Sequence, residues 1–321
     1  MADYSRYQDD SWLTNNNWGK WGADDEVGIL NDVTPADVVK AVSLIKEGKV
    51  YDLETVRFHG MPVWNGHCGF ELLTYASPIG RRNMTKQNAY PAEYSWHGKG
   101  GWIDFEQDDY HIDANTEMLI TPLHAGTHID GFGHITVGED AHWYNGYNVA
   151  EHWGDYGIMK CDGPTIPPII LRGVLLDIAG YKGLDHVPAN YGVTAEDIEE
   201  CAKWEGVELK EKDCVLIRLG ETWPTLDNCP GAGMKLEAAR CLVEGHGAFL
   251  MGDDMVAFEM NNADGTMSWP RHPHPVHHYC LDQMGVHFIE AVQMDELAKD
   301  KVYEFCFMAA PSKIKGGTGM F

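Results

Sequence analysis

The segment HAGTHIDGFGHI, residues 124–135, restricts the fold more than any other part of the sequence. It contains three histidines, one aspartate and one threonine, separated by three glycines and few apolar side chains. Such a segment has little to pack into a core, whereas imidazoles and carboxylates at this density are typical ligands of divalent metal ions. A polar surface loop is the simpler interpretation, but the clustering favours a metal site.

A helix over this segment could not gather these ligands. His124 and His128 would share one helical face, but Asp130 would lie about 200° away from His128. Pro122 and the glycines also disfavour a helix. Ala125 stands where the H-E-x-x-H motif of zinc proteases has its glutamate, so that motif is excluded as well.

An extended chain suits the segment if it bends. His124, His128 and Asp130 then fall on one face, but a straight strand separates the two histidines by about 13 Å. Two ligands of one ion lie within about 4 Å of each other, so the chain must turn between them, and Gly126 is the residue that allows the turn. The two glycines after Asp130 permit a second turn that returns His134 to the cluster.

A carboxylate inside an apolar strand marks a second candidate site. Glu290 lies in VHFIEAV, residues 286–292, and shares a strand face with apolar side chains. A buried carboxylate is costly unless a positive group pairs with it, so we expect either an ion pair with an arginine or a metal ion. His278 precedes this strand. Three further histidines of RHPHPVHH either line a pocket entrance or form a proline-stiffened surface run: His272, His274 and His277.

Capping and breaking signals predict three helices. The first begins at Thr34 and Pro35 and ends before Gly48. The second begins at Thr194, with Asp197 in the acidic position of a capping box, and ends at Gly206. The third covers residues 235–244.

Runs rich in β-branched and aromatic residues predict strands between these helices, and together they indicate an α/β fold with a mixed sheet and flanking helices. We interpret the chain as a single domain over residues 1–321, with an N-terminal extension over residues 1–50. The predicted strands cover residues 50–56, 169–178, 214–219, 248–252, 286–292 and 302–310.

Composition excludes several classes of partner. The chain carries 49 acidic and 24 basic residues, a formal net charge of −25, which repels nucleic acids and anionic membranes. It has neither a basic start followed by an apolar run nor a stretch of about 18 apolar residues, so we predict a cytoplasmic protein with no membrane contact. The eight cysteines form no C-x-x-C pair and are expected to be reduced, mostly buried thiols.

The two histidine-containing segments resemble the cyclase family of metal-dependent hydrolases, which includes kynurenine formamidases, isatin hydrolase and trans-dienelactone hydrolase. The later histidine and glutamate of the family, twelve positions apart, are matched by His278 and Glu290. The closing GGTG, residues 316–319, resembles the glycine-rich tail of the family, and WGADDEVGILN resembles its longer members. The family pattern H-x-G-T-H-x-D-x-x-x-H is matched by His124, Gly126, Thr127, His128, Asp130 and His134.

The resemblance implies the swivelling β/β/α fold of the family in a homodimer or homotetramer, and hydrolysis of a small amide or ester, in particular a cyclic amide or a lactone. Some members leave the residue matching His134 free as a general base. The predicted catalytic residues are His134 and Glu290. One or two divalent ions, zinc or manganese, would be held by the matched side chains: His124, His128, Asp130, His134, His278 and Glu290.

A metal-activated water needs no serine nucleophile, and the chain contains no G-x-S-x-G elbow. Two other functions use the same ligands: a lyase or isomerase that stabilises an enolate on the metal, and a non-catalytic metal-binding protein. Thr127 either orients a ligand or stabilises the bend. Four aromatic residues either line the substrate site or pack in the core: Trp64, Trp96, Trp102 and Phe132.

Overall fold

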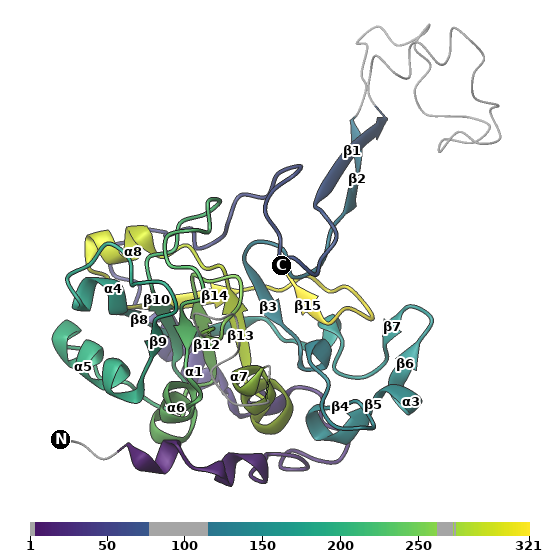
Figure 1. Ribbon diagram of the computed structural model, residues 1–321, viewed down its shortest axis with the longest axis horizontal. Coiled ribbons are helices and arrows are strands. Elements are labelled where there is room, and N and C mark those ends of the chain that lie inside the picture. Colours follow the sequence, from purple (N-terminus) through teal and green to yellow (C-terminus); the bar gives the residue numbers. More distant parts are fainter. Residues whose placement is uncertain (1–3, 77–114, 262–271, 273) are drawn as a thin grey trace, which may run out of the picture. The chain divides into compact units, whose positions relative to one another are not determined.

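The structure is a computed structural model that describes residues 4–76, 115–261, 272 and 274–321 (Figure 1). The chain divides into two compact units. The larger unit comprises Met1–Val56 and Leu123–Phe321, and the smaller comprises Arg57–Pro122. Within the described ranges, no helix has both the length and the apolar character needed to cross a bilayer.

A seven-stranded mixed sheet crosses the larger unit in the order β14-β8-β10-β12-β13-β3-β15 (Figure 1). The four strands from β8 to β13 in this order are parallel, and β14, β3 and β15 pair antiparallel. The predicted α/β class with a mixed sheet is therefore confirmed. The strands are β3 (His128–Asp130), β8 (Ile169–Asp177), β10 (Cys214–Arg218), β12 (Leu250–Asp253), β13 (His287–Glu290), β14 (Glu304–Ala309) and β15 (Gly319–Met320).

Five of the six predicted strands are present, and the exception is residues 50–56. Main-chain groups of this segment bond outside any strand ladder. The Leu53 carbonyl accepts from the Gln293 N–H at 2.9 Å, and the Thr55 N–H donates to Thr127 Oγ1 at 2.8 Å. Of its apolar side chains, Tyr51 and Leu53 pack against the core, whereas Val50 and Val56 are exposed, so the segment is not a buried strand.

The predicted helices form with the predicted caps. Helix α5 (Ala195–Glu205) has a capping box and ends at Gly206 in the left-handed conformation, with φ of 72°. Helix α1 (Pro35–Val42) has a capping box at Thr34 but is shorter than predicted, because it ends at Val42 and not just before Gly48. The Ser43 hydroxyl donates to the Lys40 carbonyl at this end and competes with the helical backbone.

The remaining elements are short. The third predicted helix is α6 (Leu236–Arg240), followed by a π-helical turn, Cys241–Gly245. The smaller unit contains the antiparallel pair β1 (Glu71–Ala76) and β2 (Thr116–Ile120). The other helices are α3 (Val149–His152), α4 (Ile178–Tyr181), α7 (Pro275–His277) and α8 (Asp295–Asp300), and the other strands are β4 (His142–Trp143), β5 (Tyr147–Asn148), β6 (Trp153–Gly154), β7 (Gly157–Ile158), β9 (Gly192–Val193) and β11 (Gly233–Met234).

The central strands are buried on both faces, which is typical of parallel strands covered by other elements. Every residue of β12, β13 and β3 is buried. The antiparallel register of β13 and β3 places Glu290 directly opposite His128. The sheet thereby brings together two polar residues that are 162 positions apart in the sequence. All eight cysteines are free thiols, and six of them are buried.

Candidate metal centre

The predicted bend lies at Gly126, which has φ of 66°, a left-handed conformation that favours glycine. Thr127 holds the bend in place. Its N–H donates to Thr55 Oγ1 at 2.7 Å, and its hydroxyl donates to the Ala291 carbonyl at 2.7 Å. Thr127 therefore has the bend-stabilising role, because its hydroxyl is bonded to main chain at the end of β13.

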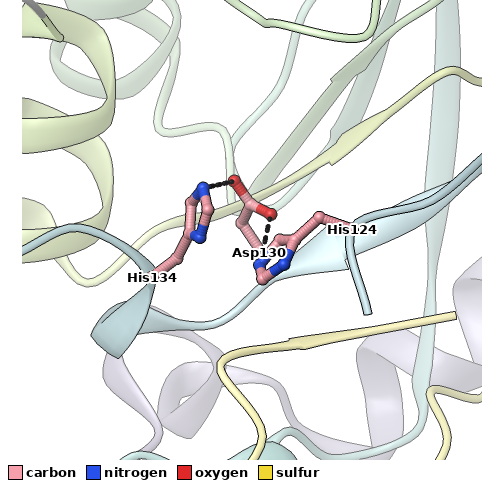
Figure 2. Close-up of side chains that lie close together, drawn as sticks. All are labelled: His124, Asp130 and His134. Carbon is pink, nitrogen blue, oxygen red and sulfur yellow. Dashed lines mark ion pairs between the residues drawn. The ribbon is translucent and has the colours of Figure 1, made fainter. Parts of the chain in front are cut away.

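A second turn returns His134 to Asp130, as predicted. The residues after β3 form a short 3₁₀ helix, Phe132–His134, and His134 Nε2 lies 3.7 Å from Asp130 Oδ2. The glycines act here by their small size: a Cβ on Gly131 would lie 2.8 Å from the Thr318 carbonyl oxygen. His124 Nε2 lies 3.5 Å from Asp130 Oδ1, and Figure 2 shows both imidazoles directed toward the one carboxylate.

The carboxyl end of β13 supplies a second set of donors. Glu290 Oε2 lies 3.4 Å from His128 Nε2, and Glu290 Oε1 lies 3.6 Å from His277 Nε2. His277 is the last residue of α7, and its Nε2 is also 3.6 Å from Asp130 Oδ2. His128 Nε2 lies 3.4 Å from Asp130 Oδ1. Asp130 is therefore common to both sets.

The structure does not bring His278 to this cluster and puts its neighbour His277 there instead. His278 Nδ1 lies 2.8 Å from His272 Nε2, and its Nε2 lies 3.5 Å from Asp282 Oδ2. Adjacent helical residues point about 100° apart, so only one of the two can face Asp130. The spacing from His277 to Glu290 is thirteen (290 − 277) and not twelve. The intervening helix His278–Met284 is a π-helix, whose turns contain more residues than α-helical turns.

The distances between these donors fit a shared cation better than they fit hydrogen bonds. The six nitrogen–oxygen contacts above are 3.4–3.7 Å long. Two ligands bound at about 2.1 Å in tetrahedral geometry lie about 3.4 Å apart. Both carboxylate oxygens of Asp130 are buried and accept no hydrogen bond of regular geometry from the described residues. Four groups of described residues could hold a metal, and two of them share Asp130: His124, Asp130 and His134, and Asp130, His277 and Glu290. The other two are Glu259 with His274 and His277, and Glu199 with Cys241 and His246.

Without a metal, protons take the place of a cation in this cluster: burial lowers the pKa of His277, but the nearby carboxylates of Glu259 and Glu290 outweigh it and raise that pKa to about 9. His128 Nδ1 lies 2.7 Å from the Gly126 carbonyl, so Nδ1 carries the proton and Nε2 presents its lone pair to the cluster. Burial raises the pKa of Asp130, but the imidazoles of His134, His128 and His124 outweigh it and hold that pKa below its usual range. Burial, with Asp130 nearby, raises the pKa of Glu290. A bound cation would compensate these carboxylates without protons.

The sequence matches the model of the family described as "Putative cyclase" over residues 51–260, more than half of the chain. The chain belongs to the cyclase family. Its structure is similar to a crystal structure of a novel cyclase, with 27% sequence identity, 96% of each chain covered and a TM-score of 0.77. The predicted family and its fold are thereby confirmed.

Two isatin hydrolases share the fold of this cyclase-family chain. Isatin hydrolase A from Labrenzia aggregata, bound to benzyl benzoate, is 20% identical, with 88% of this chain and 95% of that chain covered and a TM-score of 0.57. Isatin hydrolase A from Ralstonia solanacearum is 16% identical, with 90% and 95% covered and a TM-score of 0.56. No curated protein matches the chain in sequence.

The aromatic candidates have different positions in this cyclase-family chain. Phe132 is fully buried and stacks on His287, with ring centroids 4.0 Å apart, so it packs in the core. Trp64 belongs to the smaller unit and is 49% exposed. Trp96 and Trp102 lie outside the described residues.

Three residues near the cluster were not predicted as site residues. His287 Nδ1 lies 2.7 Å from the main-chain carbonyl of Asp130, and Glu259 contacts His277. A Cβ on Gly319 would collide with His124, so the glycine-rich tail must pass close to this ligand. A single histidine or glutamate in an apolar run carries no metal signal in the sequence, whereas the resemblance to the family tail indicated residues 316–319.

Proposed function

We propose that the chain is a metal-dependent hydrolase that cleaves a small amide or ester, in particular a cyclic amide or a lactone. The observation that carries the proposal is the set of nitrogen and oxygen donors 3.4–3.7 Å apart around buried Asp130. When bound, a divalent ion supplies an activated water and polarises the scissile carbonyl. The proposed ligands are His124, His128, Asp130, His277 and Glu290, and His134 is kept for proton transfer.

Asp130 joins the two halves of the proposed site. Its Oδ1 faces His124 and His128, and its Oδ2 faces His134 and His277. One carboxylate can therefore serve one ion or bridge two. Its complete burial and the strand pairing of β3 fix its orientation, so the site is organised before substrate binds.

His134 is the residue we assign to proton transfer. Its side chain is 23% exposed, whereas the side chain of His277 is 6% exposed, so His134 is the imidazole that substrate and solvent reach more readily. At Nε2 it can hold a proton taken from the attacking water and deliver it to the leaving group. Glu290 is buried and accepts from the Phe258 N–H at 2.9 Å, which suits a fixed metal ligand better than a residue that moves protons.

The fold shared with isatin hydrolases supports a cyclic amide as the first substrate class to test. We expect hydrolysis of a panel of lactones and cyclic amides in ¹⁸O-labelled water, with Mn²⁺ or Zn²⁺ added, to place one labelled oxygen in the product. Excess EDTA should abolish turnover. Product that carries no label would contradict hydrolysis and favour a metal-dependent lyase or isomerase. If no substrate of the panel is hydrolysed with either metal, a non-catalytic metal-binding protein is favoured.

A further inference from the structure

We infer that Glu259 is a positioning residue of the metal centre, which fixes the ring of His277 so that Nε2 faces Asp130 and Glu290. The inference rests on the proposed function. Glu259 is 2% exposed, and its carboxylate touches His277 twice. Oε1 accepts from the His277 main-chain N–H at 2.7 Å and lies 3.3 Å from Nδ1 of the same residue.

Glu259 Oε1 approaches His277 Nδ1 at 3.3 Å, longer than a regular hydrogen bond, but its charge favours a proton on Nδ1 and therefore a lone pair on Nε2 when a metal binds. His277 Nε2 lies 3.6 Å from both Asp130 Oδ2 and Glu290 Oε1. The ring also packs edge-on against Phe288, with centroids 4.6 Å apart and planes at 85°. The carboxylate and the aromatic ring together leave His277 one orientation.

Phe258, the residue before Glu259, holds Glu290, the carboxylate that faces His277. The Phe258 N–H donates to Glu290 Oε1 at 2.9 Å, and the Phe258 ring stacks on Phe288 at 4.6 Å. Main-chain bonds to β11 pin the segment, because the Met234 N–H donates to the Phe258 carbonyl at 2.8 Å. Two consecutive residues after β12 therefore set the positions of Glu290 and His277.

His274 supports Glu259 from its other side. His274 Nδ1 lies 3.0 Å from Glu259 Oε2, while the His274 N–H donates to His272 Nδ1 at 3.2 Å. With the two contacts to His277, this fixes the plane of the carboxylate. The described histidines of the segment 272–278 have separate contacts: His277 faces the cluster, His274 contacts Glu259 and His272 contacts His278.

The test is a metal titration of the wild type, Glu259→Ala and Glu259→Gln with Mn²⁺ or Zn²⁺ in competition with a chromogenic chelator. We expect Glu259→Ala to lower the affinity for whichever of the two metals binds more tightly by about 10- to 100-fold. This is the usual effect of removing the residue that bonds to the second ring nitrogen of a histidine ligand. Glu259→Gln keeps an oxygen acceptor but loses the charge, so it should show a smaller loss. Glu221→Ala is the matched control, since it removes a carboxylate that is also buried, accepts from the Thr222 N–H at 2.8 Å and belongs to none of the groups of described residues that could hold a metal.

The thermal unfolding midpoint of each metal-free variant shows whether Glu259 positions His277 or only stabilises the fold. Lower metal affinity of a variant with an unchanged metal-free midpoint supports the inference. Unchanged metal affinity of both Glu259 variants overturns it, and the proposed function then stands, because the wild type still binds metal. A lower metal-free midpoint with unchanged affinity also overturns it. If the wild type itself binds neither metal, the proposed function fails first and the inference fails with it.

Discussion

At the scale of single residues, Asp130 is the group that makes the site. It is fully buried, it lies within 3.7 Å of four imidazoles, and no regular hydrogen bond from the described residues satisfies its oxygens. Leaving a buried carboxylate without such partners costs several kcal/mol unless positive charge compensates it. The surrounding imidazoles and a bound cation are the two sources of that charge.

Glu205, which is not part of the metal cluster, makes the stability of the fold depend on pH. Burial raises its pKa to about 8 from the ordinary 4.5, although its carboxylate accepts from the Asp177 N–H at 2.7 Å. Between these two pH values the folded chain holds a proton that the unfolded chain has released. The contribution of Glu205 to stability is therefore fully present below pH 4.5 and is lost as the pH rises toward 8.

Glu205→Gln should remove this dependence. We expect the variant to be more stable than the wild type by about 1–2 kcal/mol at pH 8, after allowing for the partial exposure of the side chain, and to show no gain near pH 4.5. Urea denaturation at the two pH values measures the difference. An equal change in the free energy of unfolding at both pH values would show that Glu205 does not titrate in this window.

At the level of helices and turns, the sequence predicts a feature correctly where neighbouring residues determine it. The capping box of Thr194 with Asp197 and the left-handed Gly206 define α5 in the sequence and in the structure. Gly126 was predicted as the bend because two histidines four residues apart cannot meet on a straight strand. The segment 50–56 is predicted as a strand but is not one, because its main-chain groups bond to the Thr127 side chain and to the Gln293 N–H and not to a neighbouring strand.

The choice between His277 and His278 could not be made from the sequence. The pairing of Glu290 with His128 depends on the register of β13 and β3, and the facing histidine depends on a π-helix that no sequence pattern marks. The family spacing of twelve selects His278, whereas the observed helix turns His277 toward Asp130. The resemblance points to this segment, and within it the structure directs His277 toward Asp130 and His278 toward Asp282.

Paired substitutions test this assignment. We expect His277→Gln to weaken metal binding by at least about 10-fold, since it removes a donor that lies 3.6 Å from both Asp130 and Glu290. His278→Gln should leave metal binding unchanged, because His278 contacts His272 and Asp282 instead. Isothermal titration of the metal-free proteins with Mn²⁺ measures both. The opposite result would restore the assignment of His278 made from the spacing.

In the molecule as a whole, the site is built from two segments of the larger unit that lie far apart in the sequence. Residues 124–134 supply four donors before, within and after β3, and the chain from β12 to β13 supplies His277, Glu290 and their supports. The sheet is the element that joins them, because β3 inserts between β13 and β15. The acidic chain, with a net charge of −25, would lose part of its self-repulsion on binding divalent cations.

Metal content per chain is the most direct measure of the central claim. Elemental analysis of the purified wild type should find one or two divalent ions per chain, and Asp130→Asn should lose them. Asp282→Asn is the control, because Asp282 is an equally buried carboxylate 3.5 Å from a histidine but lies outside the cluster, so it should keep the wild-type content. Full metal content in Asp130→Asn would contradict a centre built on this carboxylate.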